Sequence, residues 1–397
     1  MTMETRKEVL RAHLEEYLKA TRKEKGVILD RLTKTLQLRR KAVIQGFSRM
    51  RKRDPWKSPP KKRGRKTLYG PEVVSALRTV WEVSEEICGE LLHPIVPEYI
   101  SVLKRDKLWK HGKSATVLLL KMSEGTMKVK VRGFLKARRK GKGNSTTKPS
   151  KLKEIIPIFT GPWEGKSPGY GQMDTVVHCG SSLSGDMVFT LQYVDTATYW
   201  SVRGAQWNKG ERATMENLKA IRSHLPFPMI GAHSDSGSEF VNWTMKRFCE
   251  EEGIDFTRSR PYHKNDNAFV EERNGHIVRK HIGYVRLDVP EVVPVLNEFY
   301  AVLNLYQNHF IPSRRCVSKE RIGSKYVRKY EKAATPYARV MNHESVPEEI
   351  KEKLRKEHES LNPLLLKREL DILRKKVFEI QKTGVGNRKI LSPFGDS

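Results

Sequence analysis

The chain has 397 residues, and its 76 Lys and Arg against 46 Asp and Glu give a formal net charge of +30 at pH 7. Such an excess of positive charge favours a polyanionic partner, and the length allows roughly two to four structural modules. The four cysteines show no CxxC or Cys/His zinc spacing, and no apolar run or signal-peptide pattern predicts membrane insertion or secretion. These features disfavour a structural zinc site, a membrane protein and a secreted protein, and they predict a cytoplasmic one.

Residues 1–50 predict a small all-α DNA-binding domain. Apolar residues recur at helical spacing up to Leu18, a second helix follows around 27–32, a turn is predicted over Thr33–Leu38, and a third helix over Arg39–Met50. A short helix, a turn and a basic helix suit a helix-turn-helix motif, whose second helix enters the major groove of DNA. A small helical bundle with a charged exterior is the alternative. The candidate DNA contacts are Arg39, Arg40 and Lys41.

Residues 51–69 predict a basic linker that Pro55, Pro59 and Pro60 keep extended. Its most compact basic part, residues 62–66, suits a narrow A·T-rich minor groove, where arginine is attracted by an enhanced negative potential. The alternative is a flexible segment that contacts phosphates only. The candidate contacts are Lys61, Lys62, Arg63, Arg65 and Lys66.

Residues 70–140 predict a second helix-turn-helix domain. Helices are expected over 71–83, 84–94, 97–107, 113–121 and 127–137. Pro94 is predicted to end the second of them. Ser123 is the expected cap of the last helix. Residues 141–160 are polar and Gly-rich and predict a basic tether to the next domain. The candidate DNA contacts are Lys128, Lys130, Arg132, Arg138 and Arg139.

Residues 161–288 predict an α/β domain. Apolar patterns indicate strands at 173–177, 187–194, 199–205, 229–233 and 254–257, and helices at 211–224, 238–252 and 267–284. Ser238 is the expected cap of the middle helix. The resulting order, β-β-β-α-β-α-β-α, is that of the ribonuclease H-like fold. Residues 289–397 predict a mostly helical region with helices at 292–310, 347–358 and 363–381.

Three acidic residues in the α/β domain predict a metal-dependent site. Asp174 lies in the first strand, Asp235 ends the fourth strand, and Glu271 falls near the start of the last helix. Two divalent cations roughly 3.5–4 Å apart can stabilise both the attacking and the leaving oxygen in phosphoryl transfer onto DNA. Mg²⁺ or Mn²⁺, which prefer hard oxygen ligands, are the expected cofactors, with two ions per site.

In this arrangement Asp174 bridges both ions, Asp235 holds one and Glu271 holds the other. Glu272 is the alternative to Glu271, because neighbouring helix residues point about a quarter-turn apart and only one can face the site. Any one such acid alone is usually just solvated, so the prediction rests on the three together. Further acids, among them Asp186, Glu239, Asp255 and Asp266, are interpreted as surface or capping residues.

Five motifs of this domain are Gly171-Gln-Met-Asp174, Val194-Asp-Thr-Ala-Thr198, His233-Ser-Asp-Ser-Gly-Ser-Glu-Phe240, Thr257-Arg-Ser-Arg-Pro-Tyr-His-Lys-Asn-Asp-Asn267 and Val270-Glu271. Together they resemble the integrase core of DDE transposases from bacterial insertion sequences, in the superfamily that includes retroviral integrases. Ser236 stands where many relatives carry Asn, at a position that is not a metal ligand in that family. The resemblance implies that Asp174, Asp235 and Glu271 are the catalytic metal ligands.

The resemblance further implies a multidomain transposase with N-terminal all-α helix-turn-helix modules, a ribonuclease H-like α/β catalytic core and a C-terminal helical region. Such a protein binds the terminal inverted repeats of a mobile element and catalyses DNA cleavage and strand transfer. It acts as a homo-multimer on double-stranded DNA and is expected at the nucleoid of a prokaryotic cytoplasm. The non-enzyme alternative is a transposase-derived DNA-binding regulator that leaves the three acids unused. A ribonuclease H-type nuclease is the third possibility.

Overall fold

The computed structural model describes residues 3–51, 68–135, 156–161, 163, 165–235, 237–260, 264–322 and 325–391, with only the backbone at 135, 264–265, 319, 322, 325–326 and 386–391. The chain forms two compact units, Met1–Leu68 and Tyr69–Ser397. Most of the predicted linker and tether lies outside the described residues. The candidate DNA contacts outside them are Lys61, Lys62, Arg63, Arg65, Lys66, Arg138 and Arg139. None of the described helices is long and apolar enough to cross a membrane.

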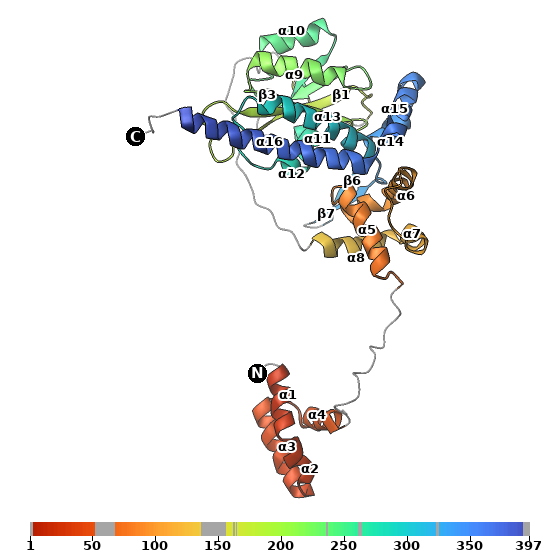
Figure 1. Ribbon diagram of the computed structural model, residues 1–397, viewed down its shortest axis with the longest axis vertical. Helices are drawn as coiled ribbons and strands as arrows, with labels where there is room; N and C mark the ends of the chain where they lie inside the picture. Colours follow the sequence, from red (N-terminus) through yellow and green to blue (C-terminus); the bar gives the residue numbers. More distant parts are fainter. Residues whose placement is uncertain are drawn as a thin grey trace. The chain divides into compact units, whose positions relative to one another are not determined.

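The N-terminal unit contains four helices, α1 (Met3–Ala12), α2 (Leu14–Lys19), α3 (Arg22–Leu36) and α4 (Arg40–Arg51) (Figure 1). They close around a core of their own, in which Leu32, Leu36 and Phe47 are almost fully buried. The turn predicted over Thr33–Leu38 is wrong, because burial of Leu36 keeps α3 helical to that residue. The chain turns instead at Gln37, which adopts a left-handed conformation with φ of 49°.

The next four helices, α5 (Pro71–Val83), α6 (Gly89–Arg105), α7 (Lys113–Leu120) and α8 (Glu124–Leu135), belong to the second unit. Their apolar side chains share one hydrophobic core with α13 (Val292–Phe310) and α16 (Pro363–Leu391). The Tyr99 hydroxyl of α6 donates to the Phe310 carbonyl at 3.2 Å, and the two rings meet edge to face. The domain predicted over 70–140 is therefore not a separate unit.

Glu85, in the turn between α5 and α6, anchors these helices through buried charge. Its carboxylate forms an ion pair with Lys280 at 3.5 Å and another with Lys367 of α16. Burial raises the pKa of Glu85, but the charges of His281, Lys280 and Lys367 outweigh it and lower the pKa to about 2. Because removing one partner of a buried ion pair is strongly destabilising, these contacts fasten the turn to the rest of the unit.

Five strands form a mixed sheet in the order β3-β2-β1-β4-β5. The strands are β1 (Tyr170–Val177), β2 (Val188–Asp195), β3 (Ser201–Trp207), β4 (Gly231–Ser234) and β5 (Asp255–Arg258). The first three are antiparallel, and β4 and β5 run parallel to β1. All five predicted strands are confirmed. Four of them contain β-branched or aromatic residues, whereas the short β4 is Gly-Ala-His-Ser and directly follows the apolar residues Met229 and Ile230.

The two faces of the sheet differ in what covers them. One face packs Met173, Leu191 and Tyr193 against α9 (Glu211–Ser223) and α10 (Trp243–Glu251). The other face meets the short helix α11 (Ala268–Arg273) and α13, with α13 and α16 lying side by side (Figure 1). Polar side chains gather on this second face, and it holds the candidate site.

The helix predicted over 267–284 is interrupted. It consists of a 3₁₀ turn Lys264–Asn267, then α11, then a π-helical segment Asn274–Val278, and finally α12 (Arg279–Ile282). Segments of π-helix are rare in globular proteins and occur frequently at functional sites. The residues that follow α11, beginning with Asn274, are therefore candidates for a functional role.

The C-terminal region is mostly helical, as predicted, but it also contains a hairpin. Strands β6 (Cys316–Ile322) and β7 (Lys325–Tyr330) follow α13, and α14 (Pro336–Met341), α15 (Glu348–Ser360) and α16 complete the chain. Helices at the three predicted positions are confirmed. The hairpin is not predicted from the sequence.

Two local predictions of helix ends are wrong. Pro94 and Pro97 both lie inside α6, because burial of Leu92, Val96 and Tyr99 along one face keeps the helix continuous through the missing backbone hydrogen bonds. For α10, the cap is not Ser238. Asn242 takes that place, and its side chain accepts a hydrogen bond from the Met245 backbone N–H at 2.8 Å.

Candidate active site

The register of β1 and β4 brings two of the predicted carboxylates together. These strands are parallel neighbours, and Met173 pairs with Ser234. Asp174 follows Met173 on β1, and Asp235 follows Ser234 directly after the end of β4. Side chains alternate between the two faces along a strand, so Gln172 and Asp174 share one face of the sheet, as His233 and Asp235 do.

Gln172 fixes the position of α11 on that face. Its side chain is fully buried. Its Nε2 donates to the Asp266 carbonyl at 2.9 Å, and its Oε1 accepts from the backbone N–H groups of Phe269 at 2.9 Å and Val270 at 3.3 Å. The first N–H groups of a helix have no partner within the helix, so β1 supplies the cap of α11. Glu271 follows directly and is held close to β1.

Glu271 is the acid of α11 whose charge acts on Asp174. The negative charge of Glu271 contributes to raising the pKa of the Asp174 carboxyl. The charge of Glu272 acts instead on Tyr199 and Arg273. The structure thus brings Asp174, Asp235 and Glu271 into one electrostatic cluster.

Asp174 is the half-buried centre of this cluster. Its Oδ1 accepts from the Thr175 backbone N–H at 2.8 Å, and its Oδ2 accepts from Asn274 Nδ2 at 2.7 Å. Burial and the charges of neighbouring carboxylates, foremost that of Asp235, raise the pKa of Asp174 well above its ordinary value. Carboxylates that share a poorly solvated volume disfavour one another's ionisation. The cluster therefore carries an excess of negative charge that a cation would offset.

Glu239 is a fourth carboxylate of the cluster, and its prediction as a surface residue is wrong. Its side chain is buried, and its Oε1 accepts from the Thr175 hydroxyl at 3.0 Å. A Cβ atom added to Gly237 would lie 2.7 Å from Glu239 Oε2 and 2.9 Å from Asp235 Oδ1. The two carboxylates therefore face one small volume beside Gly237, which suits glycine. In the sequence, only Gly237 could have indicated that Glu239 belongs to the site. A glycine allows a tight turn after Asp235, and such a turn can bring Glu239 back beside Asp235.

The donor set of the cluster suits a hard divalent cation, because all four side chains offer oxygen ligands of the kind that Mg²⁺ and Mn²⁺ prefer. As the side chains stand, no group of three or more His, Cys, Asp or Glu among the described residues is arranged to hold a metal ion. Both oxygens of Asp174 accept hydrogen bonds from the protein. Binding of a metal ion therefore requires the carboxylates to adjust, and their mutual repulsion favours that adjustment.

We expect Glu239→Gln to lower the affinity of the protein for Mn²⁺ by about 10–100-fold, the usual effect of changing a group around a metal site. Glutamine can still accept the hydrogen bond of Thr175, but it removes one negative charge from the cluster. Titration calorimetry with Mn²⁺ measures the change. Glu272→Gln is the matched control, because its charge acts elsewhere, and it should bind Mn²⁺ as the wild type does. Equal affinities for Glu239→Gln and the wild type would leave Glu239 with a structural role only.

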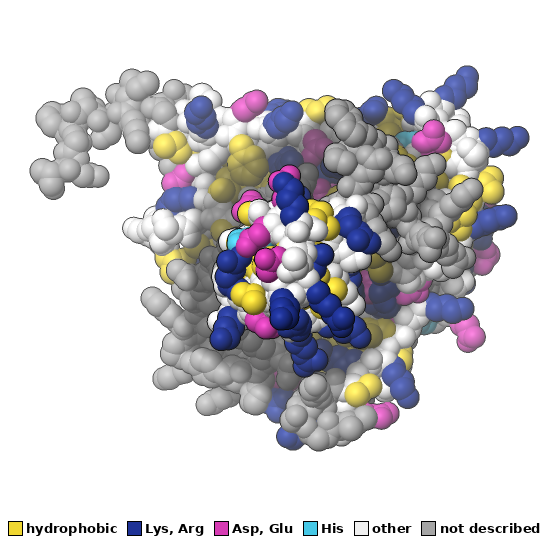
Figure 2. All heavy atoms as spheres, turned by 90° about the horizontal axis from the view of Figure 1, so that it is seen from below, with side chains coloured by type: hydrophobic (Ala, Val, Ile, Leu, Met, Phe, Trp, Pro, Cys, Tyr) yellow, Lys and Arg dark blue, Asp and Glu magenta, His cyan; other side chains and the backbone are white. Residues whose placement is uncertain are grey.

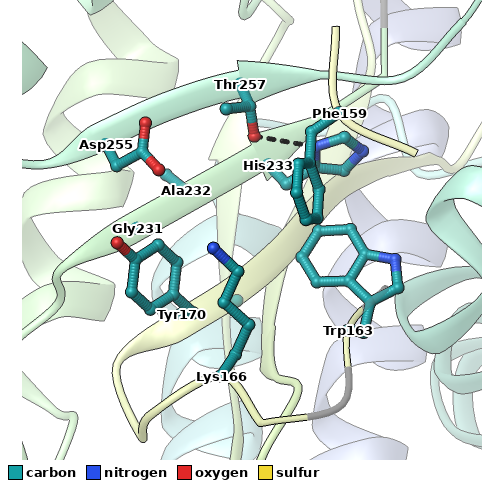
Figure 3. A pocket seen from close by; sticks show the side chains of 10 residues that line it. Phe159, Trp163, Lys166, Tyr170, Gly231, Ala232, His233, Asp255 and Thr257 are labelled. Carbon is teal, nitrogen blue, oxygen red and sulfur yellow. Dashed lines mark hydrogen bonds between the residues drawn. The ribbon is translucent and has the colours of Figure 1, made fainter. Parts of the chain in front are cut away.

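Figure 3 shows a hollow lined by aromatic residues beside β1 and β4. Phe159, Trp163, Tyr170 and His233 line it, and Lys166 Nζ lies over the Tyr170 ring, 4.2 Å from its centre. Tyr170 alternates with Gln172 and Asp174 along β1, so its side chain lies on the same face of the sheet as theirs. Tyr170 precedes Asp174 by four residues on β1, which places their Cα atoms about 13 Å apart. Aromatic rings combined with a cation are the elements with which proteins hold single-stranded nucleic acid.

The described candidates for DNA contact lie at the start of α4 and on α8. Arg39, Arg40 and Lys41 are exposed at the start of α4, and Arg40 also forms an ion pair with Asp30. Lys and Arg side chains are more widespread than acidic ones on the face of the molecule shown in Figure 2.

The remaining described candidates are on α8. Lys128 Nζ forms ion pairs with Glu90 at 3.0 Å and Glu124 at 3.8 Å, so its charge is engaged within the protein. Lys130 is half-buried, and Arg132 is exposed.

Comparison with known proteins identifies a relative of this chain. No protein-family model matches the sequence. The chain is 34% identical over 340 residues to the uncharacterized protein y4rM of Sinorhizobium fredii, a match that covers 85% of this chain and 96% of that protein. The chain therefore belongs to the same family as the y4rM protein of Sinorhizobium fredii.

Proposed function

We propose that this protein is a transposase of the DDE integrase-core type, with a ribonuclease H-like catalytic domain. It binds the terminal inverted repeats of a mobile element, cleaves the DNA there and joins the ends to target DNA. The observation that carries the proposal is the convergence of Asp174, Asp235 and Glu271, from β1, the end of β4 and α11, on one face of the sheet. A protein that only binds DNA has no need of three carboxylates in one place.

The architecture around the site supports the proposal. Three antiparallel strands are followed by two parallel strands with helices between them, the element order expected for a ribonuclease H-like fold. The net charge of +30 suits a partner as negatively charged as DNA. The N-terminal unit with its basic α4 offers a DNA-binding part that is separate from the carboxylates.

In the proposed reaction, Asp174, Asp235 and Glu271 would hold the cofactor, and Glu239 would add a fourth charge. Divalent cations held there would supply stabilisation of the attacking and the leaving oxygen at one phosphorus. Gln172 keeps α11 against β1, so that Glu271 stays near Asp174. Water is the nucleophile for cleavage and a 3′-hydroxyl is the nucleophile for strand transfer, so no covalent protein intermediate forms. A homo-multimer is the proposed active form, because each chain offers one carboxylate cluster and transposition processes two ends.

Cleavage and joining of the element's own ends test this function. The DNA that flanks the gene supplies the terminal repeats, and duplexes carrying them are incubated with the purified protein and Mg²⁺ or Mn²⁺. We expect metal-dependent cleavage at the repeat ends and joining of the ends to a second duplex. Specific binding without cleavage would point to the DNA-binding regulator. Cleavage that never leads to joining would point to a ribonuclease H-type nuclease.

We also expect a fragment of residues 1–68 to bind terminal-repeat DNA, because this unit has its own core and exposes the basic start of α4. Its affinity should fall steeply with salt, since Lys and Arg displace counterions from phosphates. Replacing Arg39 and Lys41 by alanine should reduce the slope of log affinity against log salt by about 2 if each contacts one phosphate. Fluorescence anisotropy across a salt series measures it.

The matched control for this fragment replaces Arg22 and Lys23 by alanine. Both are exposed at the start of α3, so the same charge is removed from a helix that is not expected to enter the groove. Equal losses for the two double variants would mean that the unit binds through its net charge, and the helix-turn-helix assignment of α4 would be withdrawn.

A further inference from the structure

Three polar side chains form a row across the middle of the sheet. Asp174 of β1 pairs with Gln192 of β2, and Gln192 pairs with Arg203 of β3. Gln192 is fully buried and Arg203 is 3% exposed. Buried polar groups in a folded protein are almost always hydrogen-bonded, so the partners of this row show what it holds in place.

Hydrogen bonds connect Arg203 to Asp174 through two side-chain amides. Arg203 Nε donates to Gln192 Oε1 at 3.0 Å, and Gln192 Nε2 donates to Asn274 Oδ1 at 3.1 Å. Asn274 Nδ2 then donates to Asp174 Oδ2 at 2.7 Å. Asn274 is the first residue of the π-helical segment, so the irregular part of the helix begins where the chain of hydrogen bonds passes through it.

Arg203 requires a single direction for the hydrogen bonds in this chain. A guanidinium group can only donate, so Gln192 must turn its oxygen to Arg203 and its N–H to Asn274. Asn274 must then turn its oxygen to Gln192 and its N–H to Asp174. An ionised carboxylate can only accept, so the requirements of the two ends agree. The Val270 carbonyl also accepts from Gln192 Nε2, at 3.5 Å, and so favours the same direction.

Arg203 is also a buried positive charge. Its Nη2 donates to the Ser201 hydroxyl at 2.6 Å, while its Nη1 has no hydrogen-bond partner among the described residues. Burial lowers the pKa of Arg203 to about 9. Hydrogen bonds to charged groups are stronger than neutral ones, and consecutive hydrogen bonds polarise one another. The two amides therefore extend the influence of this cation to the carboxylate cluster.

We propose that Arg203, Gln192 and Asn274 are positioning residues that orient the Asp174 carboxylate for a divalent cation through an N–H bond of fixed direction. The inference rests on the proposed function, because it assumes that Asp174 binds the cation. It assigns a role to three residues on β2, β3 and the π-helical segment that offer no ligand themselves.

Gln192→Glu tests the direction of the chain with almost no change of shape. The introduced carboxylate would pair with Arg203 through one oxygen and present its other oxygen to Asn274. Asn274 would then turn its N–H to the introduced carboxylate and its carbonyl oxygen to Asp174, where it meets a second carboxylate. We expect the affinity of the full-length protein for Mn²⁺, measured by electron paramagnetic resonance of the free ion, to fall by about 10–100-fold. The melting temperature should not fall, because the introduced carboxylate gains Arg203 as a partner.

Two further comparisons separate positioning from mere folding. Gln206→Glu adds the same charge at a buried glutamine of β3 whose Nε2 bonds to Thr214 and Asn208, and it should leave Mn²⁺ affinity unchanged. Arg203→Lys keeps a donor-only cation and should bind Mn²⁺ more tightly than Arg203→Met, which removes it.

Asp174→Asn provides the reference for the outcomes. If it weakens Mn²⁺ binding while Gln192→Glu and Arg203→Met bind as the wild type does, the positioning role is overturned and the proposed function stands. If Asp174→Asn itself binds Mn²⁺ as the wild type does, Asp174 is not a ligand, and the proposed function falls together with this inference.

Discussion

Asp174→Asn, Asp235→Asn and Glu271→Gln should each lower DNA cleavage and joining by about a thousandfold or more. Each change removes one charged metal ligand at nearly constant shape. Metal ions contribute several kcal/mol of transition-state stabilisation in such reactions, and each 1.4 kcal/mol corresponds to about a factor of ten in rate. Single-turnover cleavage of a terminal-repeat duplex measures the loss, and activity within tenfold of the wild type would remove that residue from the proposed ligand set.

Two controls make this result specific. Glu272→Gln removes a neighbouring charge on α11, but that charge acts on Tyr199 and Arg273, so cleavage should stay near the wild-type rate. Binding of the repeat DNA should be kept in all the variants, because the N-terminal unit has a separate core. A variant that loses cleavage and binding together would report damage to the fold and not loss of a metal ligand.

Local sequence patterns were sufficient to predict the strands and the placement of two acids. Asp174 and Asp235 stand at recognisable points of two apolar runs, and the parallel register of β1 and β4 then brings them together. The side chains that arrange the site were not predictable in the same way. Gln172 and Asn274 are polar residues whose hydrogen-bond partners come from distant segments of the chain. The periodicity of apolar residues does not predict such hydrogen bonds.

Local sequence patterns also could not predict which helices pack against α5–α8. The helical spacing of Leu77 and Trp81 shows that α5 buries one face, but it does not show which element covers that face. In the structure α7 and α8 cover part of that face, with the Trp81 ring 5.1 Å from the Phe134 ring of α8. Helices more than 200 residues later in the chain also contact α5, and there the Tyr306 hydroxyl donates to the Val83 carbonyl. A segment that resembles an independent domain in sequence can therefore be part of a larger core.

The shared core of α5–α8 and α13 leads to the second large expected effect. Phe310→Ala should destabilise the unit of residues 69–397 by about 3–5 kcal/mol, the usual range for deleting a buried aromatic ring. The Phe310 side chain is almost fully buried, and its ring meets Tyr99 of α6 and His358 of α15. Because the ring lies between helices from both ends of this unit, its removal should loosen α5–α8 as well as α13.

Leu365→Ala is the control on α16, since that side chain is 49% exposed and should change stability by no more than about 0.5 kcal/mol. Denaturant unfolding measures the stability, and limited proteolysis reports whether residues 69–135 become more accessible in Phe310→Ala. If these residues keep wild-type protection while the rest of the unit is destabilised, α5–α8 would be an independent domain after all.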